Sequence, residues 1–248
     1  MVPLLENNAC QVWWAHLRPA CRPSLDHLLH REEHDRRDRF SNQGDRDRYT
    51  IGTALARLVL ARHLDCRAER LRFDRACCVC GAQHGKPQLV ASPADLQFSI
   101  AHSGQRVAVA VAQGVPVGVD VERVFPLPHL DLEALAAEVL SPPERPTLEG
   151  LPPGDRAPAI LTYWTRKEAL LKATGDGLRV PMATITVSSP KKPPVLLRWS
   201  SAPGSTVSAV LRRLHPGPGY VAALAVLGLP DVRVQELDAA ELLAASRG

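Results

Sequence analysis

Three strand-like runs stand close together in residues 98–124, which read FSIAHSGQRVAVAVAQGVPVGVDVERV. They cover residues 98–101, 107–112 and 115–124, and each is rich in apolar or β-branched side chains. Short turns that contain glycine separate them, which is typical of hairpins and not of the long crossovers that parallel strands need. The stretch therefore predicts an antiparallel sheet and argues against a βαβ unit.

Helical patterns lie on both sides of this predicted sheet. Residues 49–64 keep apolar side chains at helical spacing, and residues 130–140 and 156–173 predict two further helices. Asp155 is the expected N-cap of the last helix, and Gly175 is its expected end.

Shorter strand-like runs complete the pattern, at residues 11–17, 71–73, 184–188, 195–199, 207–211, 220–226 and 232–236. A helix followed by several strands thus occurs twice along the chain. The sequence predicts an α+β fold of two similar halves, residues 1–124 and residues 125–248.

Charge and hydropathy argue against two classes of partner. The 248 residues carry a formal net charge of +4, which gives no indication of nucleic-acid binding. No apolar run approaches the roughly 18 residues of a membrane span, and residues 1–11 lack the apolar core of a secretory signal. The arginines of residues 31–48 alternate with acidic residues, which favours a solvated helix face. A cytoplasmic protein with reduced cysteines is expected.

Two acidic motifs carry the strongest functional signal. Asp120 and Glu122 alternate with valines, so both carboxylates lie on one face of a strand. Glu168 lies on the predicted helix, with Lys167 and Lys172 near it. Three carboxylates with lysines suit a divalent cation that is shared with a phosphate. Hard oxygen ligands favour Mg²⁺, and Mn²⁺ stays open.

Plainer interpretations of these residues also stay open. Asp120 and Glu122 could end a strand and meet an arginine, and an i,i+4 pair such as Glu168 with Lys172 is a common stabiliser of helix surfaces. A lysine on the rigid turn Gly85-Lys86-Pro87 can meet a phosphate as a point charge or simply be exposed.

The loop of residues 77–87 also contains a possible zinc site. Cys77, Cys80 and His84 offer three ligands, but a tetrahedral structural site needs a fourth and is usually built from two paired clusters. The sequence leaves open whether these residues bind zinc.

Taken together, several segments resemble the 4′-phosphopantetheinyl transferases of the Sfp type. The resemblance covers roughly residues 35–190, and the segments keep the order and separation that this family shows. They are Asp45-Arg46-Asp47-Arg48-Tyr49, Gly85-Lys86-Pro87, residues 98–104, residues 117–122, and the helix motif from Trp164 to Lys172 that runs on to residues 175–178.

The resemblance implies two similar halves related by pseudo-twofold symmetry, with the active site in the cleft between them. It implies that 4′-phosphopantetheine moves from coenzyme A to a serine of an apo acyl or peptidyl carrier protein. Adenosine 3′,5′-bisphosphate would be released, and a monomer is expected.

The resemblance also implies roles for single residues around the metal ion and the pyrophosphate. Asp120, Glu122 and Glu168 would hold Mg²⁺ against the pyrophosphate. Glu168, or a water on the metal, would help to deprotonate the serine, and Lys172 would contact the pyrophosphate. Glu168 and Lys172 are therefore the expected catalytic residues.

The nucleotide end of coenzyme A is assigned to other residues. Lys86 and His102 would meet the 3′-phosphate, and Arg48 another part of the nucleotide. Ala101 departs from the family, where serine is usual, and Thr53 stands where arginine is frequent. One missing neutral hydrogen bond, about 0.5–1.5 kcal/mol, should weaken coenzyme A binding without abolishing activity.

Two other functions suit the same residues. A metal-dependent phosphohydrolase acting on a nucleotide would release product without a carrier protein. A non-catalytic module that binds coenzyme A would not require all three carboxylates. For the leading function, the proline-rich segment 125–158 is the expected docking region for the carrier, with Leu130, Leu132 and Leu140 as its apolar contacts.

Overall fold

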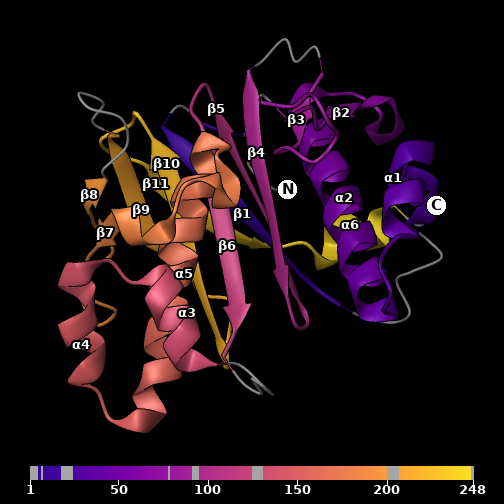
Figure 1. Ribbon diagram of the computed structural model, residues 1–248. Helices are drawn as coiled ribbons and strands as arrows, with labels where there is room; N and C mark the ends of the chain where they lie inside the picture. The colour runs from indigo at the N-terminus through magenta and orange to yellow at the C-terminus, as the bar shows by residue number, and fades with distance from the viewer. Residues whose placement is uncertain are drawn as a thin grey trace. The chain divides into compact units, whose positions relative to one another are not determined.

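The computed structural model describes residues 5–6, 8–17, 25–77, 79–90, 95–124, 131–199 and 207–246. The chain divides into two compact units. One holds Met1–Gly114 together with Arg233–Gly248, and the other holds Val115–Val232. Each combines helices with a sheet (Figure 1), so the predicted α+β class with two halves is confirmed. Within the described ranges, no helix is both long enough and apolar enough to cross a membrane.

A four-stranded sheet forms the centre of the first unit, in the order β11-β1-β5-β4. Its strands are β1 (Ala9–His16), β4 (Leu96–Ser103), β5 (Arg106–Gln113) and β11 (Arg233–Asp238). The β1–β5 and β4–β5 pairs are antiparallel, whereas β11 runs parallel to β1. A segment from late in the sequence therefore supplies an edge strand of the first sheet.

The helix α2 (Gln43–Leu64) packs against β4 and β5 in this unit (Figure 1). It begins after Asn42, whose side chain accepts a hydrogen bond from the backbone N–H of Asp45. Gly52 allows close packing, because a Cβ there would lie 3.0 Å from Cγ2 of Ile100. Aliphatic and aromatic side chains of helix and sheet fill a common core around this contact.

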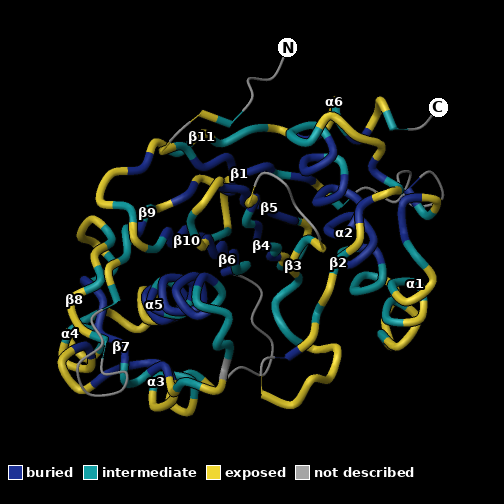
Figure 2. The backbone as a smooth tube through the Cα atoms, turned by 90° about the horizontal axis from the view of Figure 1, so that it is seen from above, coloured by how far each residue is buried: buried dark blue, intermediate teal, exposed yellow. Residues whose placement is uncertain are grey.

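Smaller elements surround this core, namely η2 (Asp26–Leu28), α1 (Arg31–Arg37), η3 (Ala68–Arg70), β2 (Phe73–Asp74), β3 (Gln88–Leu89) and α6 (Ala240–Ala245). β2 and β3 form a two-stranded antiparallel ribbon, and the loop between them carries the cysteine-rich segment. α1 has no buried residue, which confirms the solvated face predicted for its arginines (Figure 2).

A three-stranded antiparallel sheet, β6-β10-β9, forms the centre of the second unit. Its strands are β6 (Val117–Arg123), β9 (Ala209–Arg213) and β10 (Tyr220–Leu227). The other elements of this unit are α3 (Leu132–Val139), η4 (Pro142–Glu144), α4 (Arg145–Glu149), α5 (Pro153–Thr174), η5 (Gly177–Arg179), η6 (Met182–Thr184), β7 (Ile185–Val187) and β8 (Leu196–Trp199). β7 and β8 pair as a second small ribbon.

The long helix α5 packs against β6 and β10 and is buried over much of its length (Figure 2). It ends at Gly175 as predicted, where a φ of 83° suits glycine. Its start was predicted wrongly, since the helix begins at Pro153 and Asp155 lies in the first turn instead of at the cap. Proline is favoured at the first helical position, where its missing N–H costs no hydrogen bond.

The prediction of one antiparallel sheet across residues 98–124 is wrong for its third strand. β4 and β5 pair as predicted, but β6 pairs with β10. The boundary between the units therefore lies between Gly114 and Val115, before the predicted join after residue 124, and residues from Arg233 onward return to the first unit. Hairpin patterns specify neighbouring strands only, whereas β6 finds its partner much later in the chain. The pseudo-twofold relation and a cleft between the halves stay predictions.

Candidate active site

β6 and α5 bring Asp120 and Lys172 into direct contact in the second unit. Nζ of Lys172 donates a hydrogen bond to Oδ1 of Asp120 at 2.7 Å, which is also an ion pair. Asp120 is 3 % exposed, whereas 29 % of the Lys172 side chain is exposed. The pair therefore combines a buried carboxylate with a lysine whose side chain is partly exposed.

Gly118 is the residue that lets the strand and the helix approach so closely. A Cβ at this position would lie 2.0 Å from the carbonyl oxygen of Ala169 and 2.4 Å from the backbone nitrogen of Ala173. Both atoms belong to the backbone of α5, which cannot move away as a flexible side chain could. Gly118 and Asp120 share one face of β6, so the contact at Gly118 sets the position of Asp120 against the helix.

Glu168 and Glu122 extend this acidic cluster. Glu168 is 8 % exposed and lies one turn before Lys172 on α5, while Glu122 is partly buried on β6. Burial opposes the charge of Lys172, yet the surrounding carboxylates, Asp120 first among them, raise the pKa of this ammonium. Lys172 therefore stays protonated and balances part of the negative charge.

The pKa values of Asp120 and Glu168 are both raised, which favours their protonated forms. Burial raises the pKa of Asp120, and Lys172 opposes only part of that shift. Burial also raises the pKa of Glu168; Lys172 opposes the shift, and the charge of Asp120 adds to it. A further positive charge at this cluster would stabilise the ionised forms of both groups.

The donor set fits a hard divalent cation. Oδ2 of Asp120 is buried and has no hydrogen-bond partner among the described residues, which leaves a carboxylate oxygen available as a ligand. The ligand oxygens of Asp120, Glu122 and Glu168 do not form a group within 4.8 Å of one another in the described structure. Metal ligation by all three would therefore require movement of their side chains, and this assignment stays a prediction.

Arg48 and His102, both predicted to bind the nucleotide, lie near each other in the first unit. Nη1 of Arg48 donates to the backbone oxygen of Gly104 at 2.9 Å, two residues beyond the exposed His102. Both residues interact with Asp45. Hydrogen bonding from Arg48 lowers the pKa of Asp45, and the charge of His102 lowers it to a smaller extent. The second turn of α2 and the β4–β5 hairpin thus present basic groups near each other.

Lys86 lies apart from these two in sequence, at the end of the loop that joins β2 to β3. Burial lowers the pKa of Lys86 to about 8, well below that of an exposed lysine. An anion that binds beside this partly buried ammonium would favour its charged form and raise its pKa again.

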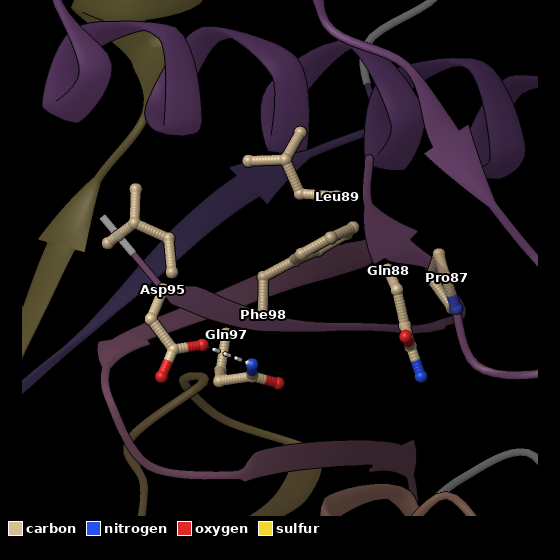
Figure 3. Close-up of a pocket in the computed structure, with 7 residues that line it drawn as sticks. Pro87, Gln88, Leu89, Asp95, Gln97 and Phe98 are labelled. Carbon is tan, nitrogen blue, oxygen red and sulfur yellow. Dashed lines mark hydrogen bonds between the residues drawn. The ribbon is translucent and has the colours of Figure 1, made fainter. Parts of the chain in front are cut away.

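The structure contains a pocket of about 240 Å³ (Figure 3), and its first lining residue in the sequence is Pro87, next to Lys86. β3 and the start of β4 line it, with Pro87, Gln88, Leu89, Asp95, Leu96, Gln97 and Phe98. Nε2 of Gln97 donates to Oδ1 of Asp95 at 3.1 Å, as the dashed line shows. Among its described lining residues, Asp95 is the one with a titratable side chain, and none of them is a predicted site residue.

Lys167 does not join the acidic cluster, although the sequence placed it near Glu168. Its Nζ is fully buried, pairs with Glu144, and donates to the carbonyl oxygen of Val139 at 2.7 Å. Glu144 also belongs to a capping box with Ser141, whose N–H donates to Oε2 of Glu144 at 2.8 Å. Lys167 is therefore part of the folded core of the second unit.

The two departures from the family pattern are both buried. Ala101 is 3 % exposed and Thr53 is 2 % exposed. Strand alternation places the Ala101 side chain on the opposite face of β4 from His102.

Two further residues, Gly118 and Asp45, support the site but were not identified individually from the sequence. The only sequence signal for them is that each belongs to one of the motifs quoted for the family resemblance.

The chain matches two models of one protein family. That of the 4′-phosphopantetheinyl transferase superfamily matches residues 116–225, and that of the N-terminal region of 4′-phosphopantetheinyl transferase matches residues 19–114. These stretches correspond closely to the two units that the fold separates.

Several named proteins are similar in sequence. The putative 4′-phosphopantetheinyl transferase slr0495 of Synechocystis sp. is 34 % identical over 68 % of this chain and 65 % of its own length, so the chain spans just under two thirds of that relative. The 4′-phosphopantetheinyl transferase HetI of Nostoc sp. is 32 % identical over 81 % of this chain and 79 % of its own. Sfp of Bacillus subtilis is 26 % identical over 78 % and 80 %, respectively.

Proposed function

The chain belongs to the 4′-phosphopantetheinyl transferase superfamily, and we propose that it transfers 4′-phosphopantetheine from coenzyme A to a serine of an apo acyl or peptidyl carrier protein. The observation that carries this proposal is the cluster of Asp120, Glu168 and Lys172, which combines carboxylates that could ligate a metal with a cation that could contact a phosphate. Adenosine 3′,5′-bisphosphate would be the second product.

Asp120, Glu122 and Glu168 are the residues that would hold the metal ion, Mg²⁺ or Mn²⁺. The buried, unpartnered oxygen of Asp120 supports this assignment. When bound, the ion would neutralise charge on the pyrophosphate of coenzyme A.

The residues of the chain can perform the remaining steps. Lys172, with its raised pKa and partly exposed side chain, would contact the pyrophosphate as a permanent cation. Glu168, whose pKa is raised by burial, is suited to accept the proton of the carrier serine. The serine oxygen would then attack the phosphorus that carries the pantetheine, and the bond from that phosphorus to the bridging oxygen would break.

Arg48, Lys86 and His102 would bind the nucleotide end of coenzyme A. The supporting observations are the hydrogen bond from Arg48 to the hairpin of His102, and the pKa of Lys86, which burial lowers to about 8 and a bound phosphate would raise. A monomer in the cytoplasm is part of the same proposal.

The docking surface for the carrier protein needs one correction. Leu140 is 1 % exposed and belongs to the core of the second unit, so it cannot contact a partner. Leu132 is partly exposed on α3, and Leu130 lies outside the described residues. Leu132 is thus the described apolar position at which substitution should raise the carrier KM and leave coenzyme A binding unchanged.

The proposed reaction is tested by mass spectrometry of an apo carrier protein incubated with coenzyme A and this enzyme. We expect a mass gain of one phosphopantetheine that requires the carrier serine and disappears with a chelator. Glu122→Ala and Glu168→Ala should remove the mass gain while the circular dichroism spectrum stays that of the wild type. Cleavage of coenzyme A without any carrier would instead identify a phosphohydrolase, and binding without turnover a coenzyme A binding module.

A further inference from the structure

A second cluster of metal-binding side chains lies in the first unit, on the loop between β2 and β3. The ligand atoms of Cys77, Cys80 and His84 all lie within 4.8 Å of one another. Sγ of Cys80 is 3.1 Å from Nε2 of His84. Among the described residues this is the group of three histidine, cysteine or acidic side chains that meets this distance.

We propose that Cys77, Cys80 and His84 bind a Zn²⁺ ion that holds this loop in place. Two thiolates and one imidazole are soft and intermediate donors. Such donors suit zinc, whereas Mg²⁺ and Ca²⁺ favour hard oxygen ligands. In a tetrahedral site with Zn–S near 2.3 Å and Zn–N near 2.0 Å, neighbouring ligand atoms lie about 3.5–3.8 Å apart. The distance of 3.1 Å between Sγ of Cys80 and Nε2 of His84 is slightly shorter than that value, and all three ligand atoms lie within 4.8 Å of one another, so small side-chain rotations are sufficient.

The backbone of the loop is already folded around the three ligands. The N–H of Gly81 donates to the carbonyl oxygen of Cys77, and the N–H of Cys77 donates to that of Ala82, both at 2.8 Å. Gly81 has a φ of 70°, a conformation that glycine adopts without strain. This tight turn brings the two cysteines together before any metal is bound, which lowers the entropy cost of binding.

Exposure of the cluster suits an open coordination position. Cys77 is buried, whereas Cys80 and His84 are exposed. An ion can therefore enter from solvent, and a water molecule can serve as the fourth ligand. Three protein ligands and a water are the coordination of catalytic zinc sites, and we expect that coordination here in place of the four protein ligands of most structural sites.

Zinc binding at this site would restrict the segment that follows His84 and contains Lys86. The N–H of Gly85 donates to the carbonyl oxygen of Arg75 at 2.7 Å, and a Cβ at Gly85 would lie 2.9 Å from the carbonyl oxygen of Ala76. β2 and β3 contribute only two residues each, so few ladder hydrogen bonds hold the loop. A metal that ties residue 77 to residue 84 would restrict the loop and fix the position of Lys86. This last step rests on the proposed function, in which Lys86 binds the 3′-phosphate of coenzyme A.

The zinc site is tested by metal analysis of the whole enzyme, purified without a histidine tag or chelator and then incubated with ZnCl₂ and desalted. We expect one zinc per chain in the wild type and loss of that zinc in Cys80→Ser and His84→Ala. Cys66→Ser removes an exposed cysteine outside the cluster and should retain zinc. Glu122→Gln should retain it too, which separates this site from the acidic cluster. A zinc-free wild type, or equal loss in Cys66→Ser, would overturn the proposal.

Co²⁺ substitution gives a readout that requires no enzymatic activity. The wild type should show thiolate-to-cobalt charge-transfer absorption, and Cys80→Ser should lose most of it. Circular dichroism must show that Cys80→Ser is folded; zinc removal from the wild type by a chelator supplies a comparison without any substitution. Absence of the thiolate bands in a folded, cobalt-loaded wild type would contradict the ligand assignment.

The effect on Lys86 is tested by calorimetry with two ligands. Zinc removal should weaken the binding of coenzyme A and leave that of 3′-dephospho-coenzyme A unchanged. Equal affinities with and without zinc would refute the positioning role, although the metal site itself would stand. If the zinc-loaded wild type bound neither ligand, the proposed function would fail, and the zinc content would still report on the metal site.

Discussion

Oδ1 of Asp120 accepts a hydrogen bond from Nζ of Lys172 at 2.7 Å, while Oδ2 of the same carboxylate is buried and has no hydrogen-bond partner in the described part of the chain. One carboxyl group thus combines a satisfied ion pair with an unused ligand atom. Lys172 balances part of the negative charge of the cluster, and in the proposed function it would contact the pyrophosphate. The first two predictions follow from this pair.

Metal binding should depend on pH. The pKa values of Asp120 and Glu168 are raised above their ordinary values of 3.8 and 4.5, so a fraction of these carboxyls must lose a proton before they can ligate. Affinity for Mg²⁺ or Mn²⁺ should therefore rise as pH rises through these raised values. Calorimetry in two buffers of different ionisation enthalpy should detect the released protons. Affinity that stays constant across this range would contradict the assignment, and Glu168→Gln should flatten the dependence.

Lys172→Met should lower the stability of the fold more at neutral than at acid pH. Its loss leaves Asp120 buried and unpaired, at a cost of about 1–3 kcal/mol in the free energy of unfolding. The pKa of Asp120 in the folded chain then rises further above its unfolded value of 3.8, so the unfolded chain binds fewer protons between these two values. Stability consequently falls as pH rises through that window.

Urea unfolding of Lys172→Met at several pH values measures this trend. The double variant Asp120→Asn/Lys172→Met removes the unpaired charge and should recover part of the lost stability at neutral pH. A Lys172→Met variant that is equally destabilised at all pH values would show that packing, and not charge, explains the loss.

Gly118→Ala should disrupt the second unit. The added Cβ would lie 2.0 Å from the Ala169 carbonyl oxygen, so β6 and α5 must separate. We expect a large fall in the melting temperature and loss of transferase activity. Gly154→Ala is the matched control, because that glycine lies on the first turn of α5 with open space around its Cβ position. The control should be neutral or gain up to about 1 kcal/mol from helix propensity.

Lys167→Met should destabilise the second unit through a different mechanism. It leaves Glu144 as a buried charge, and breaking a buried pair costs about 3–5 kcal/mol. Glu168→Gln, one residue along the same helix, should instead lose activity and keep its unfolding midpoint. Urea unfolding and carrier modification measured on both variants separate the two roles. Activity loss in Lys167→Met without destabilisation would place this lysine in the reaction.

Coenzyme A affinity should fall as pH rises through about 8, the pKa to which burial lowers Lys86. The lysine loses its charge in that range, so its attraction for a 3′-phosphate weakens. Lys86→Arg should remove this dependence, since arginine stays protonated at all of these pH values. Fluorescence titration of coenzyme A across the range provides the measurement, with 3′-dephospho-coenzyme A as the control ligand. A wild-type affinity that does not change with pH would argue against a contact with Lys86.

Local periodicity explains what could be predicted about the acidic cluster. A period of two along β6 placed Asp120 and Glu122 on one face, and a helical turn separated Glu168 from Lys172. The helical period could also have corrected the expectation that Lys167 lies near the acidic cluster. Adjacent helix residues differ by about 100° around the axis, so Lys167 and Glu168 cannot point to the same cluster.

Tertiary partners explain what could not be predicted. The pairing of β6 with β10 and of β1 with β11 joins segments far apart in the sequence, and no local pattern records such a choice. The role of Gly118 depends on the backbone of a helix that begins at Pro153. Asp155 looked like a helix cap because acidic residues favour both the cap and the first turn, and only the proline pair before it decides between them.

The parallel pairing of β1 with β11 has a consequence for the order of folding. The second unit is continuous in sequence, so all of its residues emerge from the ribosome before β11 does. The sheet of the first unit, in contrast, lacks one edge strand until residues 233–238 have been made, and β1 must keep that edge available throughout. The unit that carries the acidic cluster can therefore mature during synthesis, whereas the unit that carries Lys86 is completed last.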